Sequence, residues 1–156
     1  MKQVVAASAA LGTLPNKLPQ GVYYGGAWHR SSSQQIPVYS PSTGQEVAKV
    51  DSAGEEELEA AVKAATAGQK IWAKTIPLER SRVMREAASK IKEHKEELAR
   101  LDALDSGNSL RGMLFDVDIA VTLMEFFAGL ATEIKGETVP VGAGKVNYVV
   151  REPVGV

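Results

Sequence analysis

The stretch from Leu78 to Gly136 constrains the fold most, because its apolar residues recur with the period of an α-helix over almost its whole length. The pattern predicts two long helices that are joined at Leu104–Gly107, since a glycine commonly ends a helix. In the first helix, residues three and four positions apart lie on one face. The predicted inward face consists of Met84, Ala87, Ile91, His94, Leu98, Leu101 and Asp105.

Asp105 closes this face with a carboxylate at a helix C-terminus, where the backbone dipole disfavours negative charge. The carboxylate therefore needs a partner, and the sequence leaves two alternatives open. It can accept hydrogen bonds from the amides of Gly107 or Asn108 and cap the turn. Alternatively, it can supply an oxygen ligand to a hard cation. His94, on the same face, is expected to be a hydrogen-bonded core histidine, because neither histidine has a partner at metal-ligand spacing.

The second long helix is predicted from about Leu110 to Ile134, and it is apolar around most of its circumference. Such a helix is buried on more than one side. It lies either in the middle of a domain or with one side against a partner or a ligand passage. One apolar stripe consists of Met113, Val117, Ala120, Met124, Phe127 and Ala131. The other consists of Phe115, Ile119, Leu123, Phe126, Leu130 and Ile134.

Shorter elements precede and follow these helices. Ser52 and Glu55 form a predicted capping box at the start of a helix that ends near Gly68. Alternating residues and glycine-rich or proline-rich turns predict three β-hairpins. Their strands pair Val22–Tyr24 with Ala27–His29, Ile36–Tyr39 with Glu46–Val50, and Thr138–Val141 with Val146–Arg151.

Composition excludes several classes of function. The net charge of −1 gives no reason to expect nucleic acid or an anionic membrane as a partner. The absence of cysteine excludes disulfides, thiolate metal sites and a cysteine nucleophile within these residues. No apolar run reaches the length of about 18 residues that spans a membrane. The start of the sequence has a weak likeness to a signal peptide, since Lys2 precedes an alanine-rich run. One positive charge and a weakly apolar run nevertheless favour a mobile tail over residues 1–21 of a cytoplasmic protein, with export as the alternative.

Neither of two common nucleotide-binding motifs is present in the sequence. Gly142–Lys145 lacks the earlier glycine of a phosphate-binding loop, and Val146 stands where a serine or threonine is needed. No Gly-x-Gly-x-x-Gly follows a predicted strand, so the Rossmann core motif is absent from these residues. The 142–145 segment is therefore interpreted as a hairpin loop.

Several short motifs together resemble the N-terminal part of the NAD(P)-dependent aldehyde dehydrogenase superfamily. They occur in the order and spacing of that family from about Val22 to Val156. The motifs are Gly25–Trp28, Pro41–Gly44, the helix Glu55–Ala65, Arg80–Arg82, Leu104–Gly107, Phe126–Gly129 and Arg151–Val156. The resemblance implies an α/β fold of the aldehyde dehydrogenase type, of which this segment is mainly helical with short hairpins.

The resemblance also implies a domain organisation. Residues 22–136 would be the outer part of the cofactor-binding domain. Residues 137–156 would be the hairpin of an oligomerisation arm and the start of the next strand, and the 138–151 hairpin would join copies into a homo-oligomer. The implied cofactor is NAD or NADP, bound mainly by residues outside this chain, and the implied substrate is an aldehyde.

The resemblance implies roles for four residues. Asp105 and the backbone carbonyl of Val38 would bind a structural monovalent cation. Phe115 and Ile119 would line the tunnel through which the aldehyde enters, which would explain the second apolar stripe.

The family's catalytic cysteine, general-base glutamate, oxyanion asparagine and nicotinamide-binding glycines match positions beyond Val156. In the implied reaction, a cysteine thiolate attacks the aldehyde, hydride passes to NAD(P)+, and a water activated by the glutamate releases the acid. This chain alone is therefore expected to be inactive. The alternative is a free-standing, non-catalytic helical module for interaction or oligomerisation, whose hairpin edge offers a template for pairing.

Overall fold

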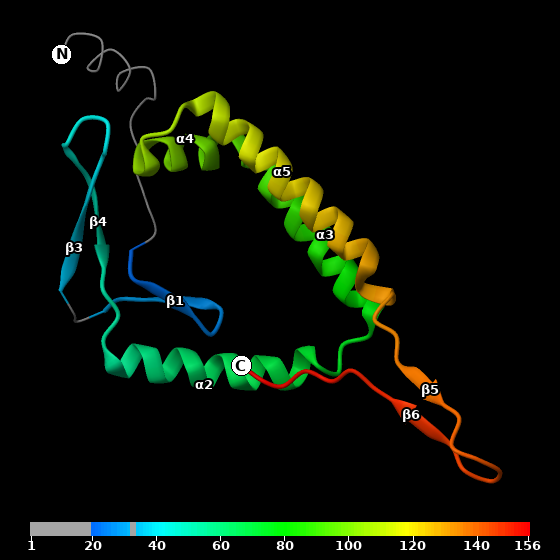
Figure 1. Cartoon of the computed structure of the whole chain (residues 1–156). Helices are drawn as coiled ribbons and strands as arrows, with labels where there is room; N and C mark the ends of the chain where they lie inside the picture. The colour runs from blue at the N-terminus through cyan, green and yellow to red at the C-terminus, as the bar shows by residue number, and fades with distance from the viewer. Residues whose placement is uncertain (1–19, 32–33) are drawn as a thin grey trace.

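The computed structural model describes residues 20–31 and 34–156, which form mainly helices with three antiparallel two-stranded hairpins (Figure 1). Most of the predicted tail, residues 1–19, lies outside the described residues. The helices are α2 (Glu55–Trp72), α3 (Pro77–Glu93), α4 (Lys95–Ser106) and α5 (Leu110–Gly129), with the 3-10 helix η1 (Leu130–Thr132). The strands are β1 (Val22–Tyr24), β2 (Ala27–His29), β3 (Gln35–Tyr39), β4 (Glu46–Asp51), β5 (Glu137–Val139) and β6 (Asn147–Val149).

All three hairpins are confirmed. The β1–β2 turn places Gly25 and Gly26 at positive φ, as expected for a two-residue hairpin turn. The β3–β4 hairpin has a register irregularity between Val38 and Tyr39. The β5–β6 hairpin is shorter than predicted, because Gly142 and Gly144 adopt positive φ in a wide loop and pairing begins only at Val139 and Asn147.

The first long helix is not continuous, so the prediction of one helix was wrong. It divides at His94, whose φ of −99° and ψ of 17° are not helical, and α4 leaves α3 at an angle (Figure 1). Glu96 and Glu97 in the first turn of α4 suit the positive end of a new helix dipole. Glu97 also lies 3.3 Å from the His94 Nδ1 atom.

Because of this break, the residues of α4 that point inward differ from those predicted for one continuous helix. The expectation that His94 lies in the core was wrong, because its side chain is 64% exposed. The buried positions of α4 are Ala99 and Ala103 instead of Leu98 and Asp105. The direction of α4 therefore follows from one residue in a bridge conformation, which a periodic pattern does not reveal.

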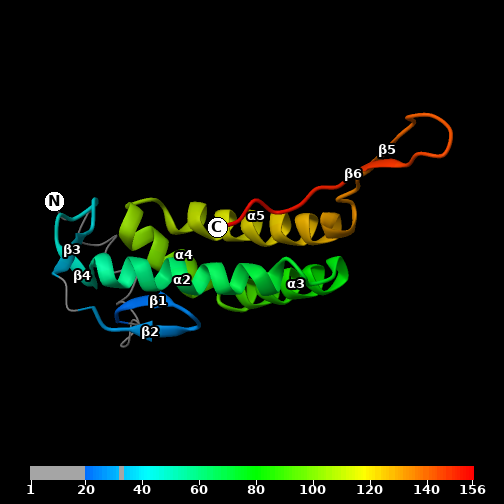
Figure 2. The ribbon, with the colours of Figure 1, turned by 90° about the horizontal axis from the view of Figure 1, so that it is seen from below.

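The core lies between α5 and the consecutive helices α3 and α4 (Figures 1 and 2). Lys95 Nζ and Asp118 Oδ2 are 2.6 Å apart and form an ion pair between α4 and α5. Small residues let the helix backbones approach closely, and Met113 fills the space beside Ala99 and Ala103. Among the described residues, the buried hydrophobic side chains are Ala88, Ala99, Ala103, Met113, Val121 and Ala128.

The start and end of α2 differ from the prediction. The N-cap residue is Gly54, and its amide donates to Glu57 Oε2 at 2.8 Å, so the Ser52–Glu55 capping box was wrong. The predicted interaction, in which a glutamate binds the free amide of the N-cap residue three positions earlier, does occur. It involves Gly54 and Glu57, two positions after the predicted pair. The helix continues past Gly68 to Trp72. No helix within residues 20–31 and 34–156 is long and apolar enough to cross a membrane.

Candidate functional site

Asp105 lies in the last turn of α4 and is exposed to solvent. The two amides that were expected to bind its carboxylate donate elsewhere. Gly107 N donates to Ala103 O at 3.1 Å, and Asn108 N donates to Ser106 Oγ at 3.2 Å. The capping alternative was therefore wrong, because Ser106 and the helix backbone already satisfy the turn. Across residues 20–31 and 34–156, no hydrogen bond or ion pair involves the Asp105 carboxylate.

Val38 lies near the end of β3, opposite Ala48 and next to the register irregularity of this hairpin. The turn that follows it packs against the α4–α5 loop. Pro41 Cβ lies 3.3 Å, and Ser42 N 3.6 Å, from the position that a Cβ on Gly107 would occupy. The structure thus brings the turn after Val38 against the loop after Asp105, although the two lie far apart in sequence.

The donors at this juncture are of the kind that a hard cation takes. The Asp105 carboxylate, which has no hydrogen bond or ion pair among the described residues, is such an oxygen ligand, and a cation would relieve the unfavourable charge at the end of α4. Among the described residues, no three side chains of histidine, cysteine, aspartate or glutamate gather as a metal cluster. A site here would thus use one carboxylate and backbone oxygens, and the Asp105–Val38 pair stays a prediction.

Phe115 and Ile119 lie one turn apart on α5, and both side chains are exposed, Phe115 by 64%. They belong to the second predicted stripe, whose other members are also exposed: Leu123, Phe126, Leu130 and Ile134. We call these six residues the open face of α5. The structure therefore presents Phe115 and Ile119 on an apolar surface, and their role as tunnel residues stays a prediction.

A feature that the sequence did not indicate lies where α2 ends and α3 begins. Two adjoining cavities, of about 310 and 510 Å³, share Trp72, Arg80 and Ile134 in their walls. Arg80 Nε is buried and has no hydrogen-bond partner among the described residues. In the sequence, Arg80 belongs to a short motif of the family, and no periodic pattern distinguishes it from the neighbouring arginines.

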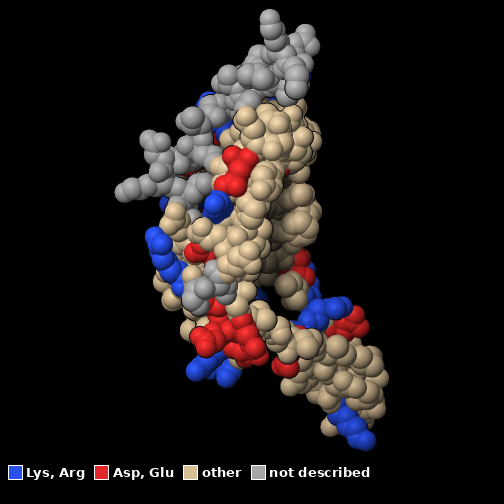
Figure 3. All heavy atoms as spheres, turned by 90° about the vertical axis from the view of Figure 1, so that its left-hand side faces the viewer, with Lys and Arg blue, Asp and Glu red and all other residues tan. Residues whose placement is uncertain are grey.

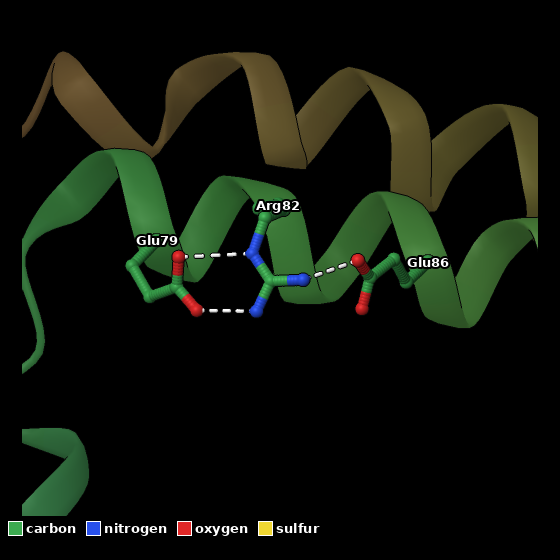
Figure 4. Close-up of polar contacts among 3 residues, drawn as sticks. All are labelled: Glu79, Arg82 and Glu86. Carbon is green, nitrogen blue, oxygen red and sulfur yellow. Dashed lines mark hydrogen bonds and ion pairs between the residues drawn. The ribbon is translucent and has the colours of Figure 1, made fainter.

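Arg82 lies two residues further along α3 and, unlike Arg80, is exposed and paired with carboxylates. Its guanidinium pairs with the carboxylates of Glu79 and Glu86 on the exposed side of the helix, and Arg82 Nε donates to Glu79 Oε2 at 2.9 Å (Figure 4). The hydrogen bond from Arg82 holds the pKa of Glu79 below its ordinary value of 4.5. The hydrogen bond to Glu79, with the nearby charges of Glu79 and Glu86, raises the pKa of Arg82.

Comparison with known proteins assigns this arrangement to a family. The model of the aldehyde dehydrogenase family matches residues 28–156, so the chain belongs to the aldehyde dehydrogenase family. It is 37% identical over 150 residues to 4-trimethylaminobutyraldehyde dehydrogenase B of Danio rerio, covering 95% of this chain and 29% of that protein. It is 43% identical over 121 residues to betaine aldehyde dehydrogenase of Cereibacter sphaeroides, covering 77% of this chain and 25% of that protein.

Solved structures agree with this assignment. PnpE in complex with nicotinamide adenine dinucleotide is 31% identical, with a TM-score of 0.83 over 88% of this chain and 28% of that chain. The Y450L variant of Staphylococcus aureus betaine aldehyde dehydrogenase in complex with NAD+ is 31% identical, with a TM-score of 0.82 over 88% of this chain and 28% of that chain. The chain thus spans less than a third of the length of these relatives.

Proposed function

We propose that this chain is the N-terminal part of an NAD(P)-dependent aldehyde dehydrogenase, which oxidises an aldehyde to a carboxylic acid. The observation that carries the proposal is the family match over residues 28–156. The likeness to two structures that hold this cofactor supports NAD as the hydride acceptor. These 156 residues include no cysteine, so the thiolate that the mechanism needs must come from outside them. The chain alone would be inactive.

In this proposal, residues 22–136 form the outer part of the cofactor-binding domain, and residues 137–156 form the arm hairpin and the start of the next strand. The hairpin projects away from the helices (Figures 1 and 2), and its surface is mostly uncharged on the face drawn in Figure 3. Val139, Tyr148 and Val149 are exposed on it. These features support a homo-oligomer joined through residues 138–151.

The open face of α5 has a role in the same proposal. Phe115 and Ile119 would line the passage of the aldehyde, since exposed apolar residues at this spacing form a continuous wall along the helix. Asp105 and the carbonyl of Val38 would hold a monovalent cation where the β3–β4 turn meets the α4–α5 loop. Both assignments concern the support of an active site and leave the bond-making chemistry to residues outside this chain.

Activity of the complete gene product tests the proposed function. Formation of NADH or NADPH is followed with a series of aldehydes, beginning with 4-trimethylaminobutyraldehyde and betaine aldehyde, for which the relatives are named. We expect aldehyde-dependent reduction of one nicotinamide cofactor. Purified complete protein that reduces neither cofactor with any aldehyde in the series would contradict the proposal.

The exposed open face of α5 favours a second candidate function, a non-catalytic interaction module. Such a module would remain a single soluble species at its working concentration, because its apolar face would be used only in a defined complex. Sedimentation of the 156-residue chain distinguishes the two functions. A monodisperse small oligomer favours the module, whereas concentration-dependent aggregation is expected of an enzyme part with an uncovered face.

A further inference from the structure

The base of the β5–β6 hairpin depends on one glycine. Gly136 stands directly before β5, and the first pair of the hairpin joins Glu137 to Val149. A Cβ atom added to Gly136 would overlap the carbonyl oxygen of Val149, and it would lie 3.3 Å from the carbonyl carbon of the same residue. These are backbone atoms, so they cannot rotate away as the end of a flexible side chain can. Gly136 therefore allows the chain that enters the hairpin and the chain that leaves it to approach closely.

Other glycines differ from Gly136 in what requires them. Gly142 and Gly144, in the hairpin loop, adopt positive φ, and among the described residues no heavy atom of a neighbouring segment lies within 4 Å of a Cβ added to either. They are needed for the shape of the loop and not for close approach. Gly68, inside α2, has neither constraint, because its φ is not positive and the described residues leave the space beside it open. Gly68 therefore provides a matched control for the substitution of Gly136.

The hairpin has little to compensate for a displaced base. Its strands form three pairs in the structure, from Glu137 with Val149 to Val139 with Asn147. A two-stranded hairpin of this length is at best marginally stable by itself. A side chain at position 136 would push the first pair apart, and the two pairs that remain would lose their fixed direction relative to the helices. The contacts that require Gly136 lie within the hairpin and its base, so they do not depend on any segment that packs beside it.

The hairpin offers main-chain pairing and apolar contact, and it offers little charge. Between Thr138 and Val150 the one charged residue is Lys145, in the loop. The outer edges of two paired strands carry backbone groups with which a further strand can pair. The hairpin projects away from the helices of its own chain, which carries those edges outward (Figures 1 and 2). A second copy of this protein fits this chemistry better than a charged ligand does.

We propose that Gly136 positions the hairpin for assembly, so that copies of the complete protein associate tightly only when this position has no side chain. The inference rests on the proposed homo-oligomer joined through residues 138–151, and it adds the residue on which that interface depends. The partner is a second copy of this chain. Gly136 acts through the position of β5 and β6 and not by contact with the partner.

Subunit association of the complete gene product tests the proposal. The molar mass is measured by sedimentation equilibrium over a range of concentrations for the wild type, for Gly136→Ala and for the control Gly68→Ala. We expect an oligomeric wild type and a subunit dissociation constant that is at least about tenfold higher in Gly136→Ala. Gly68→Ala should leave this constant unchanged. Circular dichroism should be the same for all three proteins, because the helices do not depend on the base of the hairpin, whereas a general loss of folding would change it.

An oligomeric wild type together with an unchanged dissociation constant in Gly136→Ala would overturn the role of Gly136 and leave the homo-oligomer standing. Equal effects of Gly136→Ala and Gly68→Ala would also overturn it. A monomeric wild type would overturn both this inference and the homo-oligomer, with the rest of the same polypeptide then beside the hairpin. The dehydrogenase activity is tested separately by cofactor reduction, so its failure is distinguishable from each of these results.

Should Gly136→Ala fail to fold, an alanine inserted between Lys135 and Gly136 provides the second test. The insertion retains a glycine against Val149 and turns the hairpin relative to the helices. It should therefore also raise the dissociation constant about tenfold or more. An insertion variant that associates as tightly as the wild type would show that assembly does not depend on the position of the hairpin, and this would overturn the proposal.

Discussion

The two faces of α5 have similar composition and opposite environments. Met113, Val121 and Ala128 are buried against α3 and α4, with Ala128 only 1% exposed. Phe115, Leu123 and Phe126 lie on the open face, and Phe126 is 59% exposed. The smaller side chains are thus the ones inside, and the largest apolar side chains are outside. This is the reverse of what hydrophobic burial alone would give.

The comparison shows that close approach of the helices, and not side-chain hydrophobicity alone, decides which face of α5 is buried within this chain. Alanines on α3 and α4 allow the helices to approach closely, so only small or slender residues fit between them. The aromatic residues are left for a surface that the described residues do not cover. An apolar face of this extent is typical of an interface or a ligand passage.

The largest expected effect comes from placing a charge on the buried face. Ala128→Asp should destabilise the chain by about 3–5 kcal/mol or unfold it, because the carboxylate would be buried without a partner. Phe126→Asp, on the open face, should cost less than about 1 kcal/mol in the same chain, since the carboxylate stays in water. Urea unfolding followed by circular dichroism measures both. Similar losses for the two variants would show that the faces do not differ in burial.

A substitution on the open face should affect activity more than stability. In the complete gene product, Ile119→Trp should lower kcat/KM for bulky aldehydes about tenfold or more and change that for small aldehydes little, because a larger side chain narrows a passage. Steady-state kinetics with a series of aldehydes of increasing size measures the effect. Ala120→Trp, on the exposed neighbouring position, is the matched control. Equal losses for small and bulky aldehydes would show that Ile119 is a packing residue and not part of a passage.

Two exposed aspartates at the end of α4 are expected to differ less in their effect. In the complete gene product, Asp105→Ala should lower Tm by a few degrees in potassium or sodium buffer and remove the dependence of Tm on these ions. Asp102→Ala, on the same helix and also exposed, should keep that dependence. Thermal unfolding at several salt concentrations, with choline chloride to hold the ionic strength constant, measures both. If Asp105→Ala retains the wild-type response to potassium and sodium, Asp105 does not bind the ion.

The smallest effect concerns the exposed side of α3. Because the folded-state pKa of Glu79 lies below 4.5, its carboxylate stabilises the fold above about that pH, and this contribution is lost as the pH falls through the folded-state pKa. The Tm difference between wild type and Glu79→Gln should therefore be small and positive near neutral pH and vanish in acid. High salt should reduce it, since the pair is exposed. A difference that grows below pH 4.5 would have the wrong sign.

The hairpins could be predicted because their signals are local. Gly25 and Gly26 allow the tight turn, and alternating residues beside them set the register from Val22 to His29. The open face of α5 was likewise evident from spacing alone. The first predicted stripe was only partly correct, because Met113 is buried but Phe127 is 54% exposed, and the buried residues Val121 and Ala128 belong to neither stripe. Which residues are buried depends on α3 and α4, whose relative direction is set by the break at His94.

Among the site residues, those with a local sequence signal could be predicted, whereas those that depend on contacts between distant segments could not. Asp105 was identified from a charge at a helix end, but the turn that satisfies Gly107 and Asn108 without it depends on Ser106 and the backbone. The juxtaposition of Pro41 with Gly107 and the cavities beside Arg80 arise from contacts between distant segments. A single sequence holds no local signal for such contacts, so they had to come from the structure.

The most direct test of the proposed function is cofactor reduction by the complete gene product and by the 156-residue chain, measured side by side with one aldehyde and with NAD+ or NADP+. The proposed function predicts aldehyde-dependent formation of NADH or NADPH by the complete protein and none by this chain, which lacks a cysteine. Turnover by this chain alone, or none by the folded complete protein with any aldehyde and either cofactor, would contradict it.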